Sequence, residues 1–222
     1  KLLLHKNKIG NKRNFASKKT NKKYLVFIDS DTYPLNHWLN YSLKNLKRFN
    51  IVCGPNISSN NESLEKKLIS TFRKLFFVTY DIDFKIKSKK SKIVSFAPAC
   101  NLIIKRSLYI KCNGMQENIN SAEENYLMQR LKHFNKSILF DGKMFINHKE
   151  RTVKSFFFQR ANYGSSIIDL IKNKIFIRQT IMALLSSMPF VTILLLPLVF
   201  VYKYFIFYFI FYLISLISLY FY

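Results

Sequence analysis

Tyr24-Leu-Val-Phe-Ile-Asp-Ser-Asp-Thr-Tyr-Pro34 is the stretch that decides the fold of this chain. Its first five residues are apolar or aromatic, which predicts a buried strand. The strand runs into two carboxylates, Asp29 and Asp31, with one small residue between them. Ligands of open α/β sheets bind at the carboxyl ends of strands, and two carboxylates there suit a hard divalent cation. The stretch therefore predicts a site for a hard divalent cation and metal-assisted transfer from a nucleotide-linked donor.

On either side of this strand, helical and extended patterns alternate along the chain. The helical patterns cover Lys12–Lys19, His37–Arg48, Ser63–Phe77, Ser107–Lys111 and Ala122–Phe134. The extended patterns cover Tyr24–Ile28, Ile51–Gly54, Leu102–Lys105, Ile138–Phe140 and Met144–Ile146, the last two around an Asp141-Gly142 turn. A basic loop is expected at Lys85–Lys92. Alternation of this kind predicts an α/β fold with a largely parallel sheet.

Two of the expected helices carry apolar residues at helical spacing, which predicts the faces that they bury. These residues are Trp38, Leu39, Leu43 and Leu46 in the first helix, and Tyr126, Leu127, Leu131 and Phe134 in the second.

The end of the chain has a different composition from the rest. Between Thr180 and Tyr222 the only charged residue is Lys203. The two apolar runs on either side of it each approach the roughly 20 residues that a transmembrane helix needs. Residues 179–222 are therefore predicted to be a transmembrane segment of one or two helices, and a buried core helix is the weaker alternative. The basic part that precedes it is expected on the cytoplasmic side of the inner (plasma) membrane.

A formal net charge of +24 raises the question of a nucleic-acid partner. The lysines are spread over the whole charged part of the chain, so no nucleic-acid partner is predicted. Attraction to anionic lipid headgroups is a sufficient use for the charge. The aromatic and basic stretch within residues 151–178 is expected to lie on the membrane surface. The three cysteines show no metal spacing and are expected to be free thiols, partly buried, in a reducing compartment.

Two further acidic pairs are candidates for chemistry. Asp81 and Asp83 are interpreted as solvated or paired with nearby lysines rather than as a metal site. Glu123 and Glu124 open a helix, with Ser121 as the expected N-cap. They either complement the helix dipole or supply the base that removes a proton from an acceptor hydroxyl.

Two residues beyond the acidic helix are also candidates. His148 follows an expected strand, and a metal or diphosphate contact is weighed there against a structural role. Arg160 either pairs with phosphate or is a basic residue near lipid.

The order of these pieces resembles family 2 glycosyltransferases, which are inverting enzymes with a GT-A fold. The matching stretches are Lys12–Ala16, Phe27–Asp31, Pro98–Arg106, Asn113–Glu117, Ala122–Leu131 and Ile146–Lys149. Each is weak alone, but six in the right order over residues 12–164 make a fairly specific match. The resemblance implies a Rossmann-like mixed sheet, a nucleotide-sugar donor and hexosyltransferase-like activity.

The resemblance also implies roles for individual residues. Asp29 and Asp31 would be the family's Asp-x-Asp motif, which contacts the nucleotide and a Mg²⁺ or Mn²⁺ ion, and Asp31 is preferred over Asp29 as the direct metal ligand. The Glu123-Glu124 pair matches the acidic pair that supplies the base, and Glu124 is preferred for that role. His148 matches a histidine that helps to hold metal or diphosphate. Gln159-Arg160 resembles the glutamine-arginine motif of processive synthases, but the usual tryptophan is replaced by Ala161-Asn162-Tyr163.

The resemblance further implies that a strand, a turn and a helix that grip the nucleotide base are absent before Lys1. The expected organisation is a partial catalytic domain at 1–150, an interfacial helix region at 151–178 and the membrane segment at 179–222. A lipid-linked or cell-envelope polysaccharide acceptor fits a location at the membrane. The competing hypotheses are a basic membrane-tethered protein that binds lipid or nucleic acid, a transport or scaffold subunit, and a transferase that has lost its activity.

Overall fold

The computed structural model describes residues 8–58, 63–76, 90–177, 180, 181, 206, 207, 210, 211 and 214, with 72–76 as backbone alone. The chain divides into two compact units, Lys1–Thr180 and Ile181–Tyr222. Across the described residues, no helix combines the length and the apolar character that a membrane crossing requires. Most of the predicted membrane segment at 179–222 lies outside these residues, as do Asp81 and Asp83.

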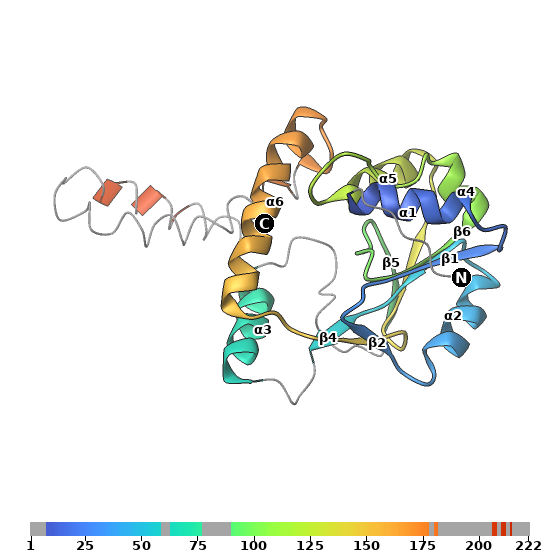
Figure 1. The fold of residues 1–222 in the computed structure, drawn as a ribbon, viewed down its shortest axis with the longest axis horizontal. Helices are drawn as coiled ribbons and strands as arrows, with labels where there is room; N and C mark the ends of the chain where they lie inside the picture. The colour runs from blue at the N-terminus through green and yellow to red at the C-terminus, as the bar shows by residue number, and fades with distance from the viewer. Residues whose placement is uncertain are drawn as a thin grey trace. The chain divides into compact units, whose positions relative to one another are not determined.

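The first unit alternates helices and short strands (Figure 1). In chain order they are α1 (Ile9–Lys18), β1 (Tyr24–Ile28), β2 (Thr32–Pro34), α2 (Trp38–Leu46), β3 (Ile51–Cys53), β4 (Asn56–Ser58), α3 (Leu64–Phe76), β5 (Ser91–Val94), β6 (Asn101–Lys105), α4 (Arg106–Lys111), α5 (Glu123–His133), β7 (Ile138–Asp141), β8 (Ile146–His148) and α6 (Val153–Lys172). The mixed α/β architecture agrees with the GT-A class that the sequence implied.

The main sheet has five strands in the order β1-β6-β3-β7-β5. Only β3 and β7 pair in parallel, whereas β1 with β6, β3 with β6, and β5 with β7 pair antiparallel. The expectation of a largely parallel sheet is therefore wrong. A strand that is buried on both faces has the same apolar pattern in either direction, so the pattern cannot report how it runs.

A smaller sheet of three strands, in the order β2-β8-β4, was not expected as a separate unit. The sequence prediction missed β2 and β4, and it placed β5 partly inside the basic loop at Lys85–Lys92. The two strands that were expected around the Asp141-Gly142 turn belong to different sheets, since β7 lies in the main sheet and β8 in the smaller one. Strands of three or four residues are too short to show a clear alternation of apolar and polar residues.

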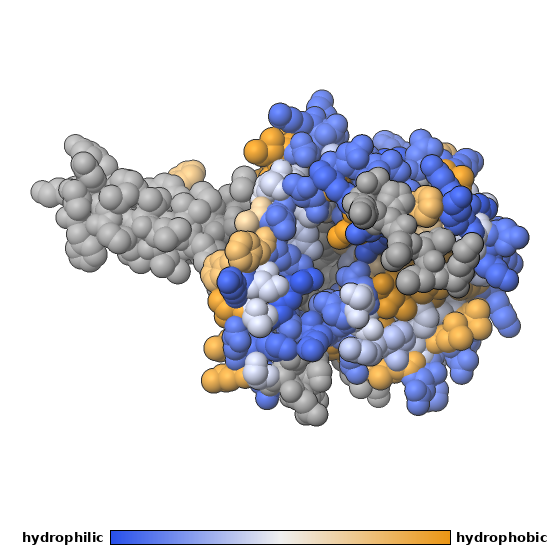
Figure 2. Space-filling view, viewed as in Figure 1, coloured by the Kyte–Doolittle hydropathy of each residue, from blue (hydrophilic) through white to orange (hydrophobic). Residues whose placement is uncertain are grey.

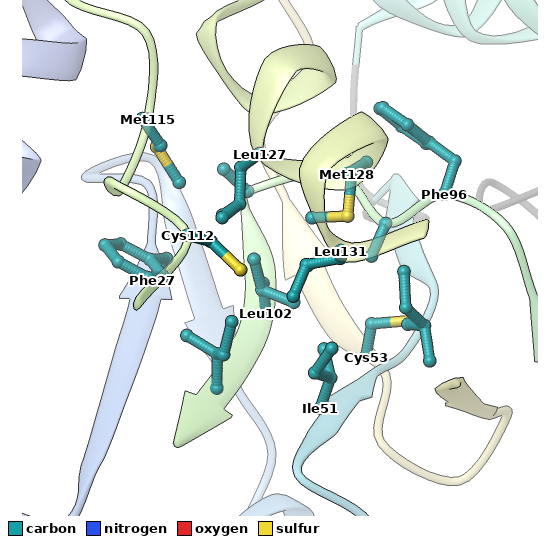
Figure 3. Close-up of a cluster of buried hydrophobic side chains, with 14 of the residues drawn as sticks. Phe27, Ile51, Cys53, Phe96, Leu102, Cys112, Met115, Leu127, Met128 and Leu131 are labelled. Carbon is teal, nitrogen blue, oxygen red and sulfur yellow. The ribbon is translucent and has the colours of Figure 1, made fainter. Parts of the chain in front are cut away.

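Side chains of the strand β6 in the main sheet alternate between its two faces, and Figure 3 shows the buried cluster on one of them. Leu102 and Ile104 of β6 pack in the cluster that contains Leu127 and Leu131 of α5. Ile103 of the same strand packs in a second cluster on the other face. Figure 1 shows α1, α4 and α5 on one side of this sheet and α2 on the other. The result is a three-layer arrangement, with a helix layer over each face.

The buried faces of two helices differ from those that the spacing predicted. In α2, Trp38 and Leu46 are buried as expected, but Leu39 is 54% exposed and Leu43 is 51% exposed. Instead, α2 buries Ser42, whose hydroxyl donates to the carbonyl of Trp38. In α5, Phe134 follows the helix and is 40% exposed rather than buried. Spacing alone does not say how far round a helix the contact with the sheet extends.

Asn101 joins the two sheets at the start of β6. Its side-chain amide donates to the carbonyls of Pro55 and Met144 at 3.1 and 2.7 Å. Its Oδ1 accepts a hydrogen bond from the indole of Trp38 at 2.9 Å. Since the residue is fully buried, these bonds satisfy polar atoms that would otherwise be costly to bury. They fix the smaller sheet, which carries part of the site described next, against the main one.

Candidate active site

The acidic turn after β1 is closed by its own hydrogen bonds. The backbone N–H and the hydroxyl of Thr32 donate to the carbonyl of Asp29 at 3.1 and 2.7 Å. This bond from residue 32 back to residue 29 makes a β-turn, and Ser30 and Asp31 are its two central residues. The turn places both carboxylates between the end of β1 and the start of β2, as the sequence predicted.

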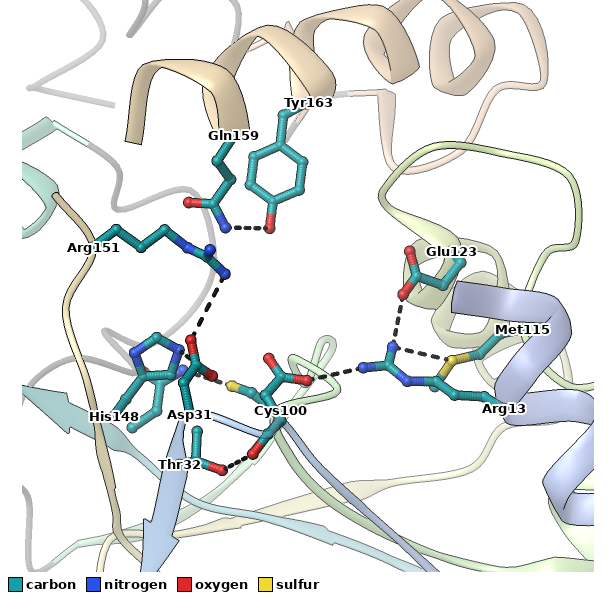
Figure 4. A network of polar contacts seen from close by, with 12 residues as sticks. Arg13, Asp31, Thr32, Cys100, Met115, Glu123, His148, Arg151, Gln159 and Tyr163 are labelled. Carbon is teal, nitrogen blue, oxygen red and sulfur yellow. Dashed lines mark hydrogen bonds and ion pairs between the residues drawn. The ribbon is translucent and has the colours of Figure 1, made fainter. Parts of the chain in front are cut away.

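The smaller sheet brings His148 to this turn. Thr32 of β2 is the antiparallel partner of His148 in β8, and the N–H of Lys149 donates to the carbonyl of Asp31 at 3.0 Å. As a result, Nε2 of the buried His148 lies 3.7 Å from Oδ1 of Asp31 (Figure 4). Oδ2 of Asp31 faces the guanidinium of Arg151 at 3.8 Å.

The geometry of Asp29, Asp31 and His148 fits one metal ion. One ligand atom from each residue lies within 4.8 Å of the others. Atoms that surround one cation at about 2.1–2.4 Å can be no more than about 4.8 Å apart, so the three residues are close enough to share an ion. Two carboxylates with one imidazole are a donor set that Mn²⁺ accepts. The candidate metal residues named from the sequence are therefore brought together.

Arg13 of α1 connects this turn with the acidic helix. Its Nη2 lies 3.0 Å from Oδ1 of Asp29, and its Nη1 donates to Oε1 of Glu123 at 2.6 Å. Nη1 also lies 3.5 Å from the sulfur of Met115 (Figure 4). A guanidinium has donors on separate nitrogens in a rigid plane, so it can hold two carboxylates at fixed positions. Asp29 and Glu123, which are far apart in the sequence, share this one cation.

Glu123 and Glu124 are the first two residues of α5, and they differ in their surroundings. Glu123 is 5% exposed and paired with Arg13. Glu124 is half-buried, and its carboxyl has no hydrogen-bond partner in another side chain of the described residues. Burial, together with the nearby charge of Glu123, raises the pKa of Glu124 to about 7, and Arg13 partly opposes this rise. A carboxyl with this pKa is suited to accept a proton near neutral pH.

The start of α5 is not capped as the sequence predicted. The N-cap residue is Ala122, in the left-handed region at φ 63°, and no side chain caps the helix there. Ser121 instead donates to the carbonyl of Asn162 at 3.0 Å and shares a hydrogen bond with Ser166 at 2.8 Å. Ser121 therefore ties the start of α5 to α6, a contact between distant segments that local sequence cannot reveal.

In the described part of the chain, Arg160 lies against aromatic side chains and is not part of the cluster of Asp29, Asp31 and His148. Its guanidinium lies over the rings of Phe156 and Tyr163, at 5.2 and 4.7 Å from their centroids. The amide of the neighbouring Gln159 lies 3.4 Å from the hydroxyl of Tyr163, and Figure 4 shows these two side chains on the side of Arg151. A phosphate contact by Arg160 therefore stays a prediction.

Three residues of this region were not singled out from the sequence. Arg13 and Arg151 are two among 36 basic residues, so their identity carried no signal. Asn14 holds the loop before α5, because its amide donates to the carbonyl of Met115 at 2.9 Å and its Oδ1 accepts from the hydroxyl of Tyr109 at 2.6 Å. The only available hint was that Arg13 and Asn14 lie inside one of the stretches that carried the family resemblance.

The three cysteines are free and buried, as expected for Cys53, Cys100 and Cys112. The thiol of Cys53 lies fully inside the core, and burial raises its pKa. Cys100 lies 2.7 Å from the amide of Asn56. None of the three contributes to the cluster of Asp29, Asp31 and His148.

Comparison with known proteins gives a match at the level of a family. The profile described as Glycosyl transferase family 2 matches residues 2–112. No curated protein matches the chain.

Three of the solved structures that are similar to the chain have low sequence identity to it. S. aureus TarS 1–349 in complex with UDP-GlcNAc has 16% identity and a TM-score of 0.44, over 68% of this chain and 41% of that one. The UDP complex of the same TarS chain has 16% identity and a TM-score of 0.43, over 64% and 40%. A197 from STIV has 14% identity and a TM-score of 0.39, over 68% and 81%. The chain thus spans about two fifths of the length of the TarS structures.

Proposed function

Because the chain belongs to glycosyl transferase family 2, we propose that it is a transferase that moves a hexose from a nucleotide-sugar donor to an acceptor hydroxyl with inversion. The observation that carries this proposal is the position of Arg13, which joins the Asp29 side of the site to the Glu123 side. Donor and acceptor chemistry need separate acidic groups close to each other. The described residues provide both within one contact network.

The donor side is assigned to the cluster of Asp29, Asp31 and His148. These residues would hold Mg²⁺ or Mn²⁺, with Asp31 as the principal ligand. The metal, when bound, neutralises negative charge on the leaving diphosphate. Arg151, which faces Asp31 at 3.8 Å, adds a positive charge on the same side. Arg160 is a further candidate for contact with phosphate if α6 or its side chain shifts.

The acceptor side is assigned to Glu124. Its carboxylate accepts the proton of the acceptor hydroxyl while the acceptor oxygen forms a bond to C1 of the sugar. The bond between C1 and the diphosphate oxygen breaks at the same time, and the nucleoside diphosphate leaves with the electron pair. Attack from the face opposite the leaving group inverts the configuration at C1. Glu123 stays paired with Arg13 and keeps the start of α5 in place.

The acceptor is proposed to be lipid-linked or a cell-envelope polysaccharide, at the inner (plasma) membrane. Two features of the sequence support this location: the nearly uncharged stretch 180–222, with Lys203 alone, and the net charge of +24 in the chain. Residues 179–222 would anchor the protein, and the catalytic part would face the cytoplasm by the positive-inside rule.

The direct test is release of nucleoside diphosphate by the full-length protein in membranes, over a panel of sugar nucleotides, with and without Mn²⁺ or Mg²⁺. We expect release from one donor, loss of release with EDTA, and recovery on adding the metal back. Asp31→Asn and Glu124→Gln should each lower the rate by about 100-fold or more. Lys12→Met, on an exposed neighbour of Arg13, is the matched control and should leave the rate unchanged.

The opposite results would identify the competing hypotheses. No release from any donor, in a folded protein, would overturn the transferase and favour a chain that has lost its activity. Lipid or nucleic-acid binding that survives in Asp31→Asn and Glu124→Gln, together with no release, would favour the basic tethered binding protein.

A further inference from the structure

Helix α6 has an apolar face that does not face the core. Phe156, Ser166 and Leu170 of this helix are buried, and Leu170 belongs to the main core cluster. Five other apolar side chains of the helix are at least 41% exposed: Val153 at 41%, Phe157 at 55%, Phe158 at 64%, Ile168 at 59% and Ile171 at 41%. A surface helix normally turns polar residues outward, so a second apolar face needs a reason.

Four of these exposed residues form one continuous stripe, and Phe158 lies to one side of it. Val153, Phe157, Gly164, Ile168 and Ile171 are separated by four, seven, four and three residues, which are the spacings of one helix face. Gly164 lies in open space, since a Cβ placed there would have no neighbouring atom within 4 Å. At about 1.5 Å per residue, the stripe is about 27 Å long. We call these five residues the outer stripe of α6.

Helix α3 extends the apolar surface where the outer stripe begins. Oε1 of Glu65 accepts a hydrogen bond from the backbone N–H of Val153 at 2.6 Å, so the first turns of α3 and α6 are adjacent. Leu64 and Leu68 of α3 are 75% and 62% exposed. Figure 2 shows apolar residues along the edge of the molecule that is formed by α6 and α3.

Lysines flank the outer stripe, and the carboxylate of Glu65 lies at its start. Lys154 and Lys172 each follow a stripe residue directly, so they lie on the same flank at its two ends, and both are exposed. Lys67 of α3 is also exposed. Asp169 is the acidic residue within α6 and lies about a quarter of a turn away from Ile168. An apolar stripe edged by lysines is complementary to the surface of an anionic bilayer.

The sequence that follows α6 points to the same partner. The helix ends at Lys172, and from Thr180 to Tyr222 the chain carries Lys203 as its one charge. A segment of this composition partitions into lipid. It would hold α6 within a few residues of the bilayer, where a second apolar face can be buried in the headgroup region.

We propose that the outer stripe of α6, together with Leu64 and Leu68 of α3, docks into the headgroup region of an anionic lipid bilayer. This inference deepens the proposed function, because it rests on a membrane-attached transferase and specifies which face meets the lipid. The same helix carries Gln159 and Tyr163 on the side of Arg151 and Asp31 (Figure 4). A docked α6 therefore brings the acidic site to the membrane surface, where a lipid-linked acceptor is found.

The test measures the depth of single positions in the full-length protein, reconstituted in vesicles of phosphatidylcholine with phosphatidylglycerol. An environment-sensitive fluorophore is attached at Phe157→Cys, Ile168→Cys and Asn162→Cys. Asn162 is exposed on the same helix but away from the outer stripe, and its carbonyl rather than its side chain makes the contact with Ser121. The native protein, whose cysteines are all buried, gives the background labelling.

We expect blue-shifted emission at positions 157 and 168, with quenching by lipids labelled near the headgroup several-fold stronger than at position 162. Vesicles of phosphatidylcholine alone should give weaker quenching at both stripe positions. Equal quenching at all three positions would overturn the proposal. A blue shift that needs no vesicles and grows with protein concentration would overturn it too, because a second copy would then cover the stripe. Neither readout depends on activity, so failure here is separate from failure of the proposed transfer.

Discussion

Arg13 and Glu123 are joined by a 2.6 Å hydrogen bond, although they lie on different helices, α1 and α5. Both are mostly removed from solvent, with side chains that are 18% and 7% exposed. The second nitrogen of the guanidinium pairs with Asp29 at 3.0 Å. This single cation therefore supports the start of the acidic helix and the acidic turn after β1 at once.

Replacing Arg13 with Met should destabilise the fold, because the buried carboxylate of Glu123 loses its partner. Breaking a buried pair from one side costs about 3–5 kcal/mol, and unfolding in denaturant measures the loss. The double variant Arg13→Met/Glu123→Gln should recover a large part of it. Lys12→Met serves as the control for losing one positive charge nearby. If the double variant is no more stable than Arg13→Met alone, the ion pair is not the cause.

Glu124→Gln should have opposite effects on activity and on stability. The wild-type rate should rise with pH up to about pH 7 and then level off, because the base must be deprotonated and its pKa is about 7. The variant should lose this dependence along with most of its activity. Arg13→Met should shift the rise of the rate with pH to higher pH values, since Arg13 lowers the pKa of Glu124.

The stability effect of Glu124→Gln follows from the same raised pKa. The folded state holds the proton more tightly than the unfolded state, whose Glu has a pKa of 4.5. This contribution to stability is complete below pH 4.5 and is lost as the pH rises to about 7. Gln should therefore stabilise the protein at pH 8 by on the order of 1 kcal/mol and have little effect near pH 4. Equal effects at both pH values would show that the carboxyl is not perturbed.

His148→Ala should weaken metal binding. Even partners outside the ligand shell typically change metal affinity about 10- to 100-fold, and loss of a ligand should cost at least as much. Titration of free Mn²⁺ by electron paramagnetic resonance measures the affinity without any substrate. His37→Ala, at an exposed position before α2, is the matched control. An unchanged Mn²⁺ affinity in His148→Ala would remove this residue from the site.

Two glycines should respond to alanine in opposite ways. At Gly54 a Cβ would overlap the carbonyl oxygen of Met144, and this backbone atom cannot easily move. Gly54→Ala should lower stability by about 1–3 kcal/mol. At Gly164, within α6, a Cβ meets nothing, so Gly164→Ala should raise stability by about 0.5–1 kcal/mol. Thermal unfolding of both variants checks the pair, and a loss of stability in Gly164→Ala would show that this face of α6 is packed.

Local patterns were sufficient for two of the elements that carry the site, β1 and α5. The apolar run 24–28 forms β1 with the predicted bounds, and the acidic turn follows it. The helix that begins with Glu123 was expected one residue earlier. These features depend on the order of apolar, polar and turn residues over a few positions, and this order is visible in the sequence itself.

The sequence by itself therefore determined the strand before Asp29, the acidic helix and the candidate acids, because each depends on neighbours in the chain. Only the tertiary structure decided the directions of the strands, the smaller sheet that brings His148 to Asp31, and the bridge from Arg13 to Asp29 and Glu123. Strand direction and ion pairing depend on which distant segments come into contact. An apolar or basic residue in the sequence does not indicate which distant residue will be its partner.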